Sequence, residues 1–417
     1  MEQGAWRPVT PGQRIEAMDV LRGFALFGIL LMNIEWFTSP MVGRADGIDP
    51  GLHGLARGLD ALTYVFASGK FWTLFSLLFG MGFAVMQARA DAAGRPFVPV
   101  YLRRTVGLLV IGLAHAWLLW AGDILVAYAL AALLLMAFAR APVAGLWAGG
   151  AALYLSIAGL MALSALVAGA PGGWADNPER LRDATEQLAL QAAEIRAYGA
   201  GSYAEATAFR LRFFVEYLPS GVLFMLPMAL GMFLVGAGLV RSGAMADPVA
   251  HRALFRTLAF VCGPAGLLLT IVGLAIDPQP DMHGADIASA LWAMTLHMIG
   301  APLMSLGYVG LVVLAPRRGH AGLAVLAPAG RMALTLYLMQ SLVCTWVFYG
   351  YGLGLWGTMG RVAQVVLVLA IFCAQLAFAH AWMARFRLGP VEWLWRAFTY
   401  LRWPPMRHVP PSHSVRP

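Results

Sequence analysis

The sequence predicts an all-α, polytopic integral membrane protein with a bundle of about ten transmembrane helices, and three observations lead to this fold class. Of its 417 residues, 60% are hydrophobic and only 12% are charged. The mean hydropathy of +0.70 lies far above that of soluble domains. Apolar runs of roughly 20 residues, the length that crosses about 30 Å of hydrocarbon, recur along the chain. One soluble core could not bury them all.

Apolar runs bounded by charged residues, glycine or proline define the elements in chain order. Residues 1–403 are expected to form one transmembrane domain, and the proline-rich residues 404–417 a disordered cytoplasmic tail. The first run carries Asp19 and Arg22 and no small-residue cleavage site follows it, so it is expected to remain as the first span. The predicted spans are 18–36, 61–87, 103–120, 123–140, 143–168, 219–240, 256–276, 287–315, 328–350 and 361–384.

The distribution of arginine predicts the orientation of the protein. Arginines gather between spans two and three, six and seven, and eight and nine, and again in the C-terminal tail. Because short cytoplasmic loops retain positive charge, an even number of spans places both termini in the cytoplasm. The net charge of +8 is therefore explained by topology, and no nucleic-acid partner is expected.

The longest exterior segment is predicted over residues 169–218. Asn177 is expected to cap a helix whose first residue is Pro178. Leu181, Leu188 and Ile195 recur every seven residues on one face of that helix. We therefore expect an amphipathic helix, which lies on the outer membrane surface, covers an exterior cavity or is simply solvated.

A histidine and an aspartate are the candidate catalytic residues. His115 lies eleven residues after Arg104 in the third span, toward its exterior side, and the short turn that follows brings back Asp123. Histidine titrates near neutral pH, and a carboxylate beside it would orient the ring, which suits general acid–base chemistry. A packing histidine is the alternative. His297 and His380 have no acidic partner near them in sequence, so we expect them to be packing or interface residues.

Polar residues on the first two spans are candidate binding residues, because ionisable groups in a membrane usually face a protein interior. Asp19 and Arg22 share a helical face, as a local ion pair or as part of a site. Asn33 lies on about the same side, roughly 16 Å further along, and would bind substrate or make a packing hydrogen bond. Lys70, the only lysine in the chain, either extends to the membrane surface or binds an anionic group.

The ninth span adds further candidates. Arg331 opens it, and Thr335, Gln340 and Ser341 follow within it, so a polar-lined cavity is expected there. No spacing typical of metal ligands occurs, and the three cysteines are expected to act as small apolar residues.

These residues fall within motifs of a known family. The sequence resembles the YeiB-like family (domain of unknown function 418) of bacterial multi-spanning membrane proteins, a member of the transmembrane acyltransferase superfamily. The resemblance runs from end to end. Its motifs are Arg14–Gly23 continuing to Asn33, Lys70–Gly80, Gly112–His115 with Gly122–Leu125, Gly330–Ser341 and Gly389–Trp393.

The resemblance implies a location in the bacterial inner membrane and an activity. Relatives such as the lysosomal heparan-glucosaminide acetyltransferase move acyl groups from cytosolic acyl-CoA to a sugar across the membrane. Asp19, Arg22 and Gly23 match the opening motif of that superfamily. However, the bacterial sugar O-acyltransferases carry histidine where this chain has Asn33, and no exterior-loop histidine motif is evident around His53. The catalytic base is therefore not carried over, and His115 with Asp123 is predicted instead.

Three functional hypotheses follow. In the first, Arg22, Arg104 and Arg331 line a cytoplasmic cavity for acyl-CoA, with acetyl-CoA as the expected donor, and His115 deprotonates a sugar, lipid or envelope-glycan acceptor. In the second, His115 and Asp123 form the site of a proton-coupled transporter or exporter of a small or lipid-linked substrate. In the third, the protein is a non-catalytic scaffold. Membrane lipids are expected partners in each case, and homo-oligomerisation is left open.

Overall fold

The computed structural model of the protein describes residues 16–43, 47–170, 179–282, 284, 286–315 and 322–408. Within these ranges every named regular element is a helix, and one isolated β-bridge joins Phe386 to Arg407. The predicted all-α fold is therefore confirmed. Part of the predicted tail is also described: the Arg387 N–H donates to the Met406 carbonyl oxygen at 2.9 Å, which holds residues 404–408 against the preceding chain. The rest of that tail, 409–417, lies outside the described residues.

Eight segments of the described chain are long and apolar enough to cross a membrane. They correspond to the predicted spans one to three, five to eight and ten, so the protein is a polytopic membrane protein whose helices contact lipid. The segments are α1 (Glu16–Thr38), α2 (Gly54–Phe66) with α3 (Lys70–Ala92), α4 (Phe97–Leu118), α6 (Val143–Ala168), Ser220–Arg241 within α8 (Tyr203–Arg241), Arg252–Ile276 with α9 (Arg252–Thr257) and α10 (Gly263–Ile276), α11 (Ile287–Leu314) and α15 (Arg361–Arg385).

The predicted spans four and nine are helical but irregular. Span four is α5 (Leu125–Leu135) with a short 3-10 turn after it, an apolar helix shorter than a full membrane span. Span nine is broken at Met332 into α13 (Ala327–Arg331) and α14 (Ala333–Phe348), with a bend of 80°. Broken spans place free helix ends inside a bundle, where polar groups must satisfy them.

The carboxylate of Glu392 satisfies the new N-terminus of α14. Glu392 lies on α16 (Pro390–Tyr400), and its Oε1 accepts hydrogen bonds from the N–H groups of Leu334 and Thr335 at 2.8 and 3.0 Å. A carboxylate there also complements the helix dipole. A Cβ at position 389 would collide with this carboxylate, which explains the glycine of the Gly389–Trp393 motif.

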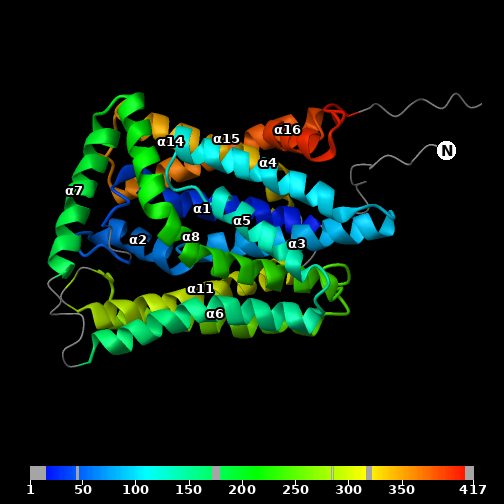
Figure 1. The fold of residues 1–417 in the computed structure, drawn as a ribbon, viewed down its shortest axis with the longest axis horizontal. Coiled ribbons are helices and arrows are strands. Elements are labelled where there is room, and N and C mark those ends of the chain that lie inside the picture. The colour runs from blue at the N-terminus through cyan, green and yellow to red at the C-terminus, as the bar shows by residue number, and fades with distance from the viewer. Residues whose placement is uncertain are drawn as a thin grey trace, which may run out of the picture.

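The helices form a layered bundle around α1. In Figure 1, α4, α15 and α16 lie along one edge, α6 and α11 along the opposite edge, and α1, α3 and α5 between them. Within this arrangement α1 packs against α3, α11, α13, α14 and α15, and it is among the most buried of the spans. Asp19 on α1 is accordingly buried in the protein, with 3% of its surface exposed.

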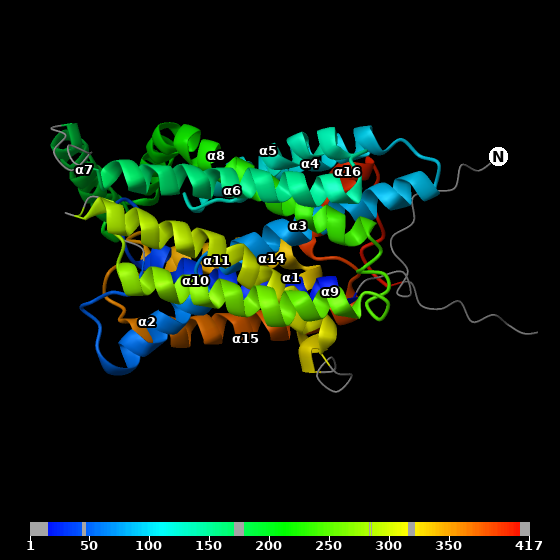
Figure 2. The same cartoon turned by 90° about the horizontal axis from the view of Figure 1, so that it is seen from below.

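The two opposite ends of the helix bundle carry different residues. The end where α1 begins and α16 lies also carries Arg22, Arg104 and Arg331, and we call it the arginine end (Figure 1). At the opposite end lie α2 and α7 (Glu179–Gly199), and we call it the α7 end (Figures 1 and 2).

Glycines allow α13 to touch the first helix at the arginine end. A Cβ at Gly330 would collide with the Asp19 carbonyl oxygen, and a Cβ at Gly23 would collide with the Leu326 carbonyl oxygen. The backbones are therefore in direct contact, as small residues permit in membrane helices. This contact brings the family motif of the first span, Arg14–Gly23, against that of the ninth span, Gly330–Ser341.

The predicted exterior segment 169–218 contains α7 and the first half of α8. The predicted amphipathic helix is present, but its heptad face points away from the protein, because Leu188 and Ile195 are 65% and 45% exposed. The face that packs on the bundle carries Leu190, Glu194 and Tyr198. Residues 171–178, with the expected cap Asn177, lie outside the described residues, as does the side chain of Leu181.

Candidate functional site

A hydrogen-bonded His–Asp pair lies inside the protein where α4 turns into α5. The Nδ1 atom of His115 lies 2.7 Å from Oδ1 of Asp123, and their side chains are 0% and 2% exposed. Asp123 Oδ2 accepts a hydrogen bond from the Val126 N–H at 2.8 Å, so the carboxylate also caps the first turn of α5. The turn predicted from the sequence thus brings the two candidate catalytic residues into contact.

A serine from a distant part of the chain completes this cluster. The Oγ atom of Ser341 on α14 lies 2.8 Å from Nε2 of His115. The ring of Tyr337, one turn earlier on α14, lies 5.1 Å from the imidazole, and Trp120 contacts it edge-on. With Nδ1 facing a carboxylate, the neutral ring carries its proton on Nδ1, so Nε2 accepts a hydrogen bond from the serine hydroxyl. We call Ser341, His115 and Asp123 the buried triad.

The arginine end holds a cluster of cations. Arg22 forms an ion pair with Asp19 at 3.0 Å. A local ion pair was one of the two alternatives predicted for these residues. Arg104 stacks on the ring of Trp395 with its guanidinium carbon 3.8 Å from the centroid, and both Arg22 and Arg396 lie close enough to repel it. Like charges held together attract a polyvalent anion.

Arg331 lies at the same end, with Nη2 3.4 Å from the Arg387 carbonyl oxygen. Four arginines from α1, α4, α13 and α16 therefore gather at the arginine end, and we call Arg22, Arg104, Arg331 and Arg396 the arginine cluster. The sequence predicted the first three. Arg396 was not predicted, because it lies in an amphipathic helix whose position over α4 depends on tertiary packing.

The α7 end contains an ionic cluster that the sequence did not reveal. Arg361, at the start of α15, forms ion pairs with Glu35 on α1 and with Asp60 on α2, the latter at 3.1 Å. All three side chains are largely buried, and Asp60 Oδ2 also accepts the Asp49 N–H at 2.9 Å. One feature of the sequence could have indicated this cluster. All three ionisable residues lie at the exterior ends of predicted spans, Glu35 at the end of span one and Asp60 and Arg361 at the starts of spans two and ten.

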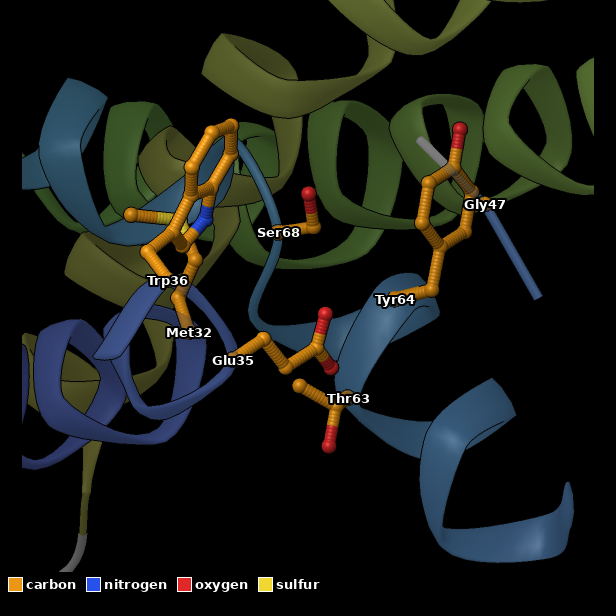
Figure 3. Close-up of a pocket in the computed structure, with 7 residues that line it drawn as sticks. All are labelled: Met32, Glu35, Trp36, Gly47, Thr63, Tyr64 and Ser68. Carbon is orange, nitrogen blue, oxygen red and sulfur yellow. The ribbon is translucent and has the colours of Figure 1, made fainter. Parts of the chain in front are cut away.

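A small pocket opens beside this ionic cluster. Figure 3 shows the Glu35 side chain extending from α1 toward Thr63 on α2, with Tyr64 and Ser68 beside it. A carboxylate, hydroxyls and aromatic rings line this small pocket. The residues that line the pocket are Met32, Glu35, Trp36, Gly47, Thr63, Tyr64 and Ser68.

Lys70 and His297 lie behind the pocket. Lys70 is fully buried and its Nζ donates to the Tyr64 carbonyl oxygen at 3.0 Å. The alternative that Lys70 extends to the membrane surface is therefore wrong, because its position at the break between α2 and α3 turns it inward. The His297 ring packs at a tilt against the Tyr64 ring, with their centroids 4.5 Å apart, as expected for a packing histidine.

The predicted binding residues thus fall in three places. Gln340 lies in the middle of the bundle, where its amide donates to Gln375 Oε1 at 3.0 Å and ties α14 to α15. Asn33 is half-buried on α1, next to the pocket residue Met32. Lys70 and Asn33 belong to the α7 half, whereas Asp19, Arg22, Arg104 and Arg331 belong to the arginine end.

Glu194 on α7 fixes the chain that connects α1 to α2. Its carboxylate accepts the N–H groups of Met41 and Val42 at 2.9 and 3.0 Å. Burial raises the pKa of this carboxyl from 4.5 to about 7, against the opposing effect of those hydrogen bonds.

Stability of the protein is expected to fall with rising pH because of Glu194. The folded state holds the Glu194 proton up to about pH 7, whereas an unfolded chain releases it near 4.5, so the stabilisation is complete at low pH and lost across that window. The loss is of the order of 3 kcal/mol. Thermal unfolding in detergent at pH 5.5 and pH 8.5 measures about 2 kcal/mol of this loss, because the part of the window below pH 5.5 is not sampled. Glu194→Gln should show a smaller difference between the two pH values, and an equal difference would contradict the assignment.

Comparisons with known proteins relate the chain to bacterial proteins and to one protein family. Residues 239–402 match the family model described as "Protein of unknown function (DUF418)". The chain is 36% identical to "Uncharacterized protein YxaH" of Bacillus subtilis (strain 168), over 96% of this chain and 98% of the relative. It is 33% identical to "Uncharacterized protein YeiB" of Escherichia coli (strain K12), over 93% of this chain and 96% of the relative. No solved structure matches.

Proposed function

The chain belongs to the DUF418 family that includes YxaH and YeiB, and from this premise we propose that it is an acyltransferase of the bacterial inner membrane. It would transfer an acyl group from cytosolic acyl-CoA to a sugar, lipid or envelope glycan. The observation that carries the proposal is the buried triad, an acid–base group built inside a membrane bundle with a cationic cluster at one end and a polar pocket at the other.

In this proposal the arginine end faces the cytoplasm, as the positive-inside tendency favours. The arginine cluster would bind the phosphates of acyl-CoA, since guanidinium groups form charge-assisted, often paired hydrogen bonds with phosphate. The thioester would then extend between the helices toward His115. The acceptor would approach from the opposite side, where Glu35, Thr63 and Ser68 offer hydrogen bonds to hydroxyl groups.

Binding of acetyl-CoA to the purified protein in detergent tests the donor site. We expect saturable binding by calorimetry, weakened about 10-fold or more in Arg22→Ala and in Arg331→Ala, because a hydrogen bond to a charged group contributes roughly 1.5–3 kcal/mol. Arg212→Ala is the matched control, because Arg212 is 60% exposed and pairs with Glu216 on the first half of α8. If neither acetyl-CoA nor longer acyl-CoAs bind, the donor site is refuted.

A proton-coupled transporter is the second candidate. It is favoured by the ionisable groups buried at two depths of the bundle, the His115–Asp123 pair and the Glu35–Arg361–Asp60 cluster. Such a protein would move a small or lipid-linked substrate in proteoliposomes when a proton gradient is applied, without acyl-CoA. The acyltransferase requires the donor instead, so donor dependence distinguishes the two.

A further inference from the structure

The hydrogen bonds of His115 determine which hydroxyl it can deprotonate. Its two ring nitrogens are both engaged, Nδ1 with Asp123 at 2.7 Å and Nε2 with Ser341 at 2.8 Å. A neutral imidazole has one basic nitrogen, and here that nitrogen faces Ser341. An acceptor substrate that is to lose its proton directly to His115 would first have to displace the serine. The hydroxyl already in position is that of Ser341.

We propose that Ser341 is a nucleophile and carries the acyl group as an ester between donor and acceptor. The inference rests on the proposed acyltransferase function and deepens it by adding a covalent intermediate. The order Ser–His–carboxylate, with each pair in hydrogen-bond contact, is the general arrangement for activating a serine hydroxyl. It is recognised by geometry and roles rather than by position in sequence.

The two half-reactions balance as follows. Ser341 Oγ attacks the thioester carbonyl carbon, its proton passes to His115 Nε2, the C–S bond breaks, and the thiolate takes that proton to leave as free thiol. An acceptor hydroxyl then gives its proton to Nε2 and attacks the ester carbon. The bond from carbon to Oγ breaks, and Ser341 regains a proton. Asp123 stabilises the imidazolium in both halves.

The position of Ser341 suits a relay between two sides of a membrane. It lies eight residues beyond Ala333, or about 12 Å along α14 from the end near the arginine cluster. A serine ester at that depth would accept the acyl group from a donor held at one end and present it to an acceptor from the other. Neither substrate then needs to cross the bundle.

A fluorophosphonate probe tests the nucleophile without any assumption about the donor, because such reagents modify serine hydroxyls activated by a neighbouring base. We expect covalent labelling of Ser341, located by peptide mass spectrometry, to be absent in Ser341→Ala and at least 10-fold slower in His115→Ala. Thr345→Val is the matched control, because Thr345 lies one turn further on α14, is buried, and its hydroxyl donates to the Leu342 carbonyl oxygen. Failure to label Ser341 in folded wild-type protein would overturn the proposal.

Exchange of radiolabelled CoA into acetyl-CoA without acceptor tests the intermediate. A serine ester predicts exchange in the wild type and none in Ser341→Ala. If the protein transfers acetyl groups but shows no exchange, or Ser341→Ala still exchanges, the serine ester is refuted while the acyltransferase stands. If Ser341 labels with the fluorophosphonate but acyl-CoA neither exchanges nor donates an acyl group, the proposed donor is refuted and the activated serine stands.

Discussion

Removing the imidazole of His115 is expected to lower acyl transfer about 10³-fold while the protein still folds. The ring makes both proton transfers of the proposed reaction, and general acid–base catalysis typically contributes 10²- to 10⁴-fold. The measurement is incorporation of radiolabelled acetyl groups from acetyl-CoA into the envelope fraction of inverted membrane vesicles that contain His115→Ala. His380→Ala is the control, because that histidine is exposed and contacts the Val325 carbonyl oxygen.

Asp123→Asn sharpens the same prediction. An asparagine keeps the size of the side chain and an oxygen to accept the Val126 N–H, but its amide would donate to Nδ1 of His115. The ring proton would then lie on Nε2, which could no longer accept from Ser341. We expect a loss comparable to that in His115→Ala with little change in thermal stability. Activity within about 3-fold of the wild type in both variants would refute the assignment of this pair.

The sequence could predict the spans and the His115–Asp123 contact because both are local. A membrane span is visible as one apolar run, and these two residues are only eight positions apart across a short turn. The breaks between α2 and α3 and between α13 and α14 could not be predicted from the sequence. Gly69 adopts a φ of +74° at the start of α3, and Met332 separates α13 from α14, yet hydropathy continues through both positions.

The remaining site residues depend on how helices pack. Ser341 is 226 positions from His115, and its role follows only from the placement of α14 beside α4. Polar residues in the ninth span predicted a polar cavity, but nothing in the sequence indicated which of them would contact the histidine. Likewise, Glu35, Asp60 and Arg361 come from three different helices, so their ionic cluster is a property of the tertiary structure.

Replacing Arg361 by methionine is expected to have the largest effect on folding. The change would leave Glu35 and Asp60 buried as two carboxylates without a cation, and removing one partner of a buried ion pair typically costs about 3–5 kcal/mol. We expect a low yield of monodisperse protein and a lower unfolding temperature in detergent. Arg212→Met, which breaks the exposed pair with Glu216, should cost no more than about 1 kcal/mol.

A compensated variant separates charge from shape. If the uncompensated carboxylates cause the loss, then Arg361→Met combined with Glu35→Gln and Asp60→Asn should recover much of the unfolding temperature, because all three charges are gone while the packing volume is kept. If the triple variant is as unstable as Arg361→Met alone, the arginine acts through packing or hydrogen bonds rather than charge. A recovered triple variant that still binds acetyl-CoA would show that these three charges are dispensable for donor binding.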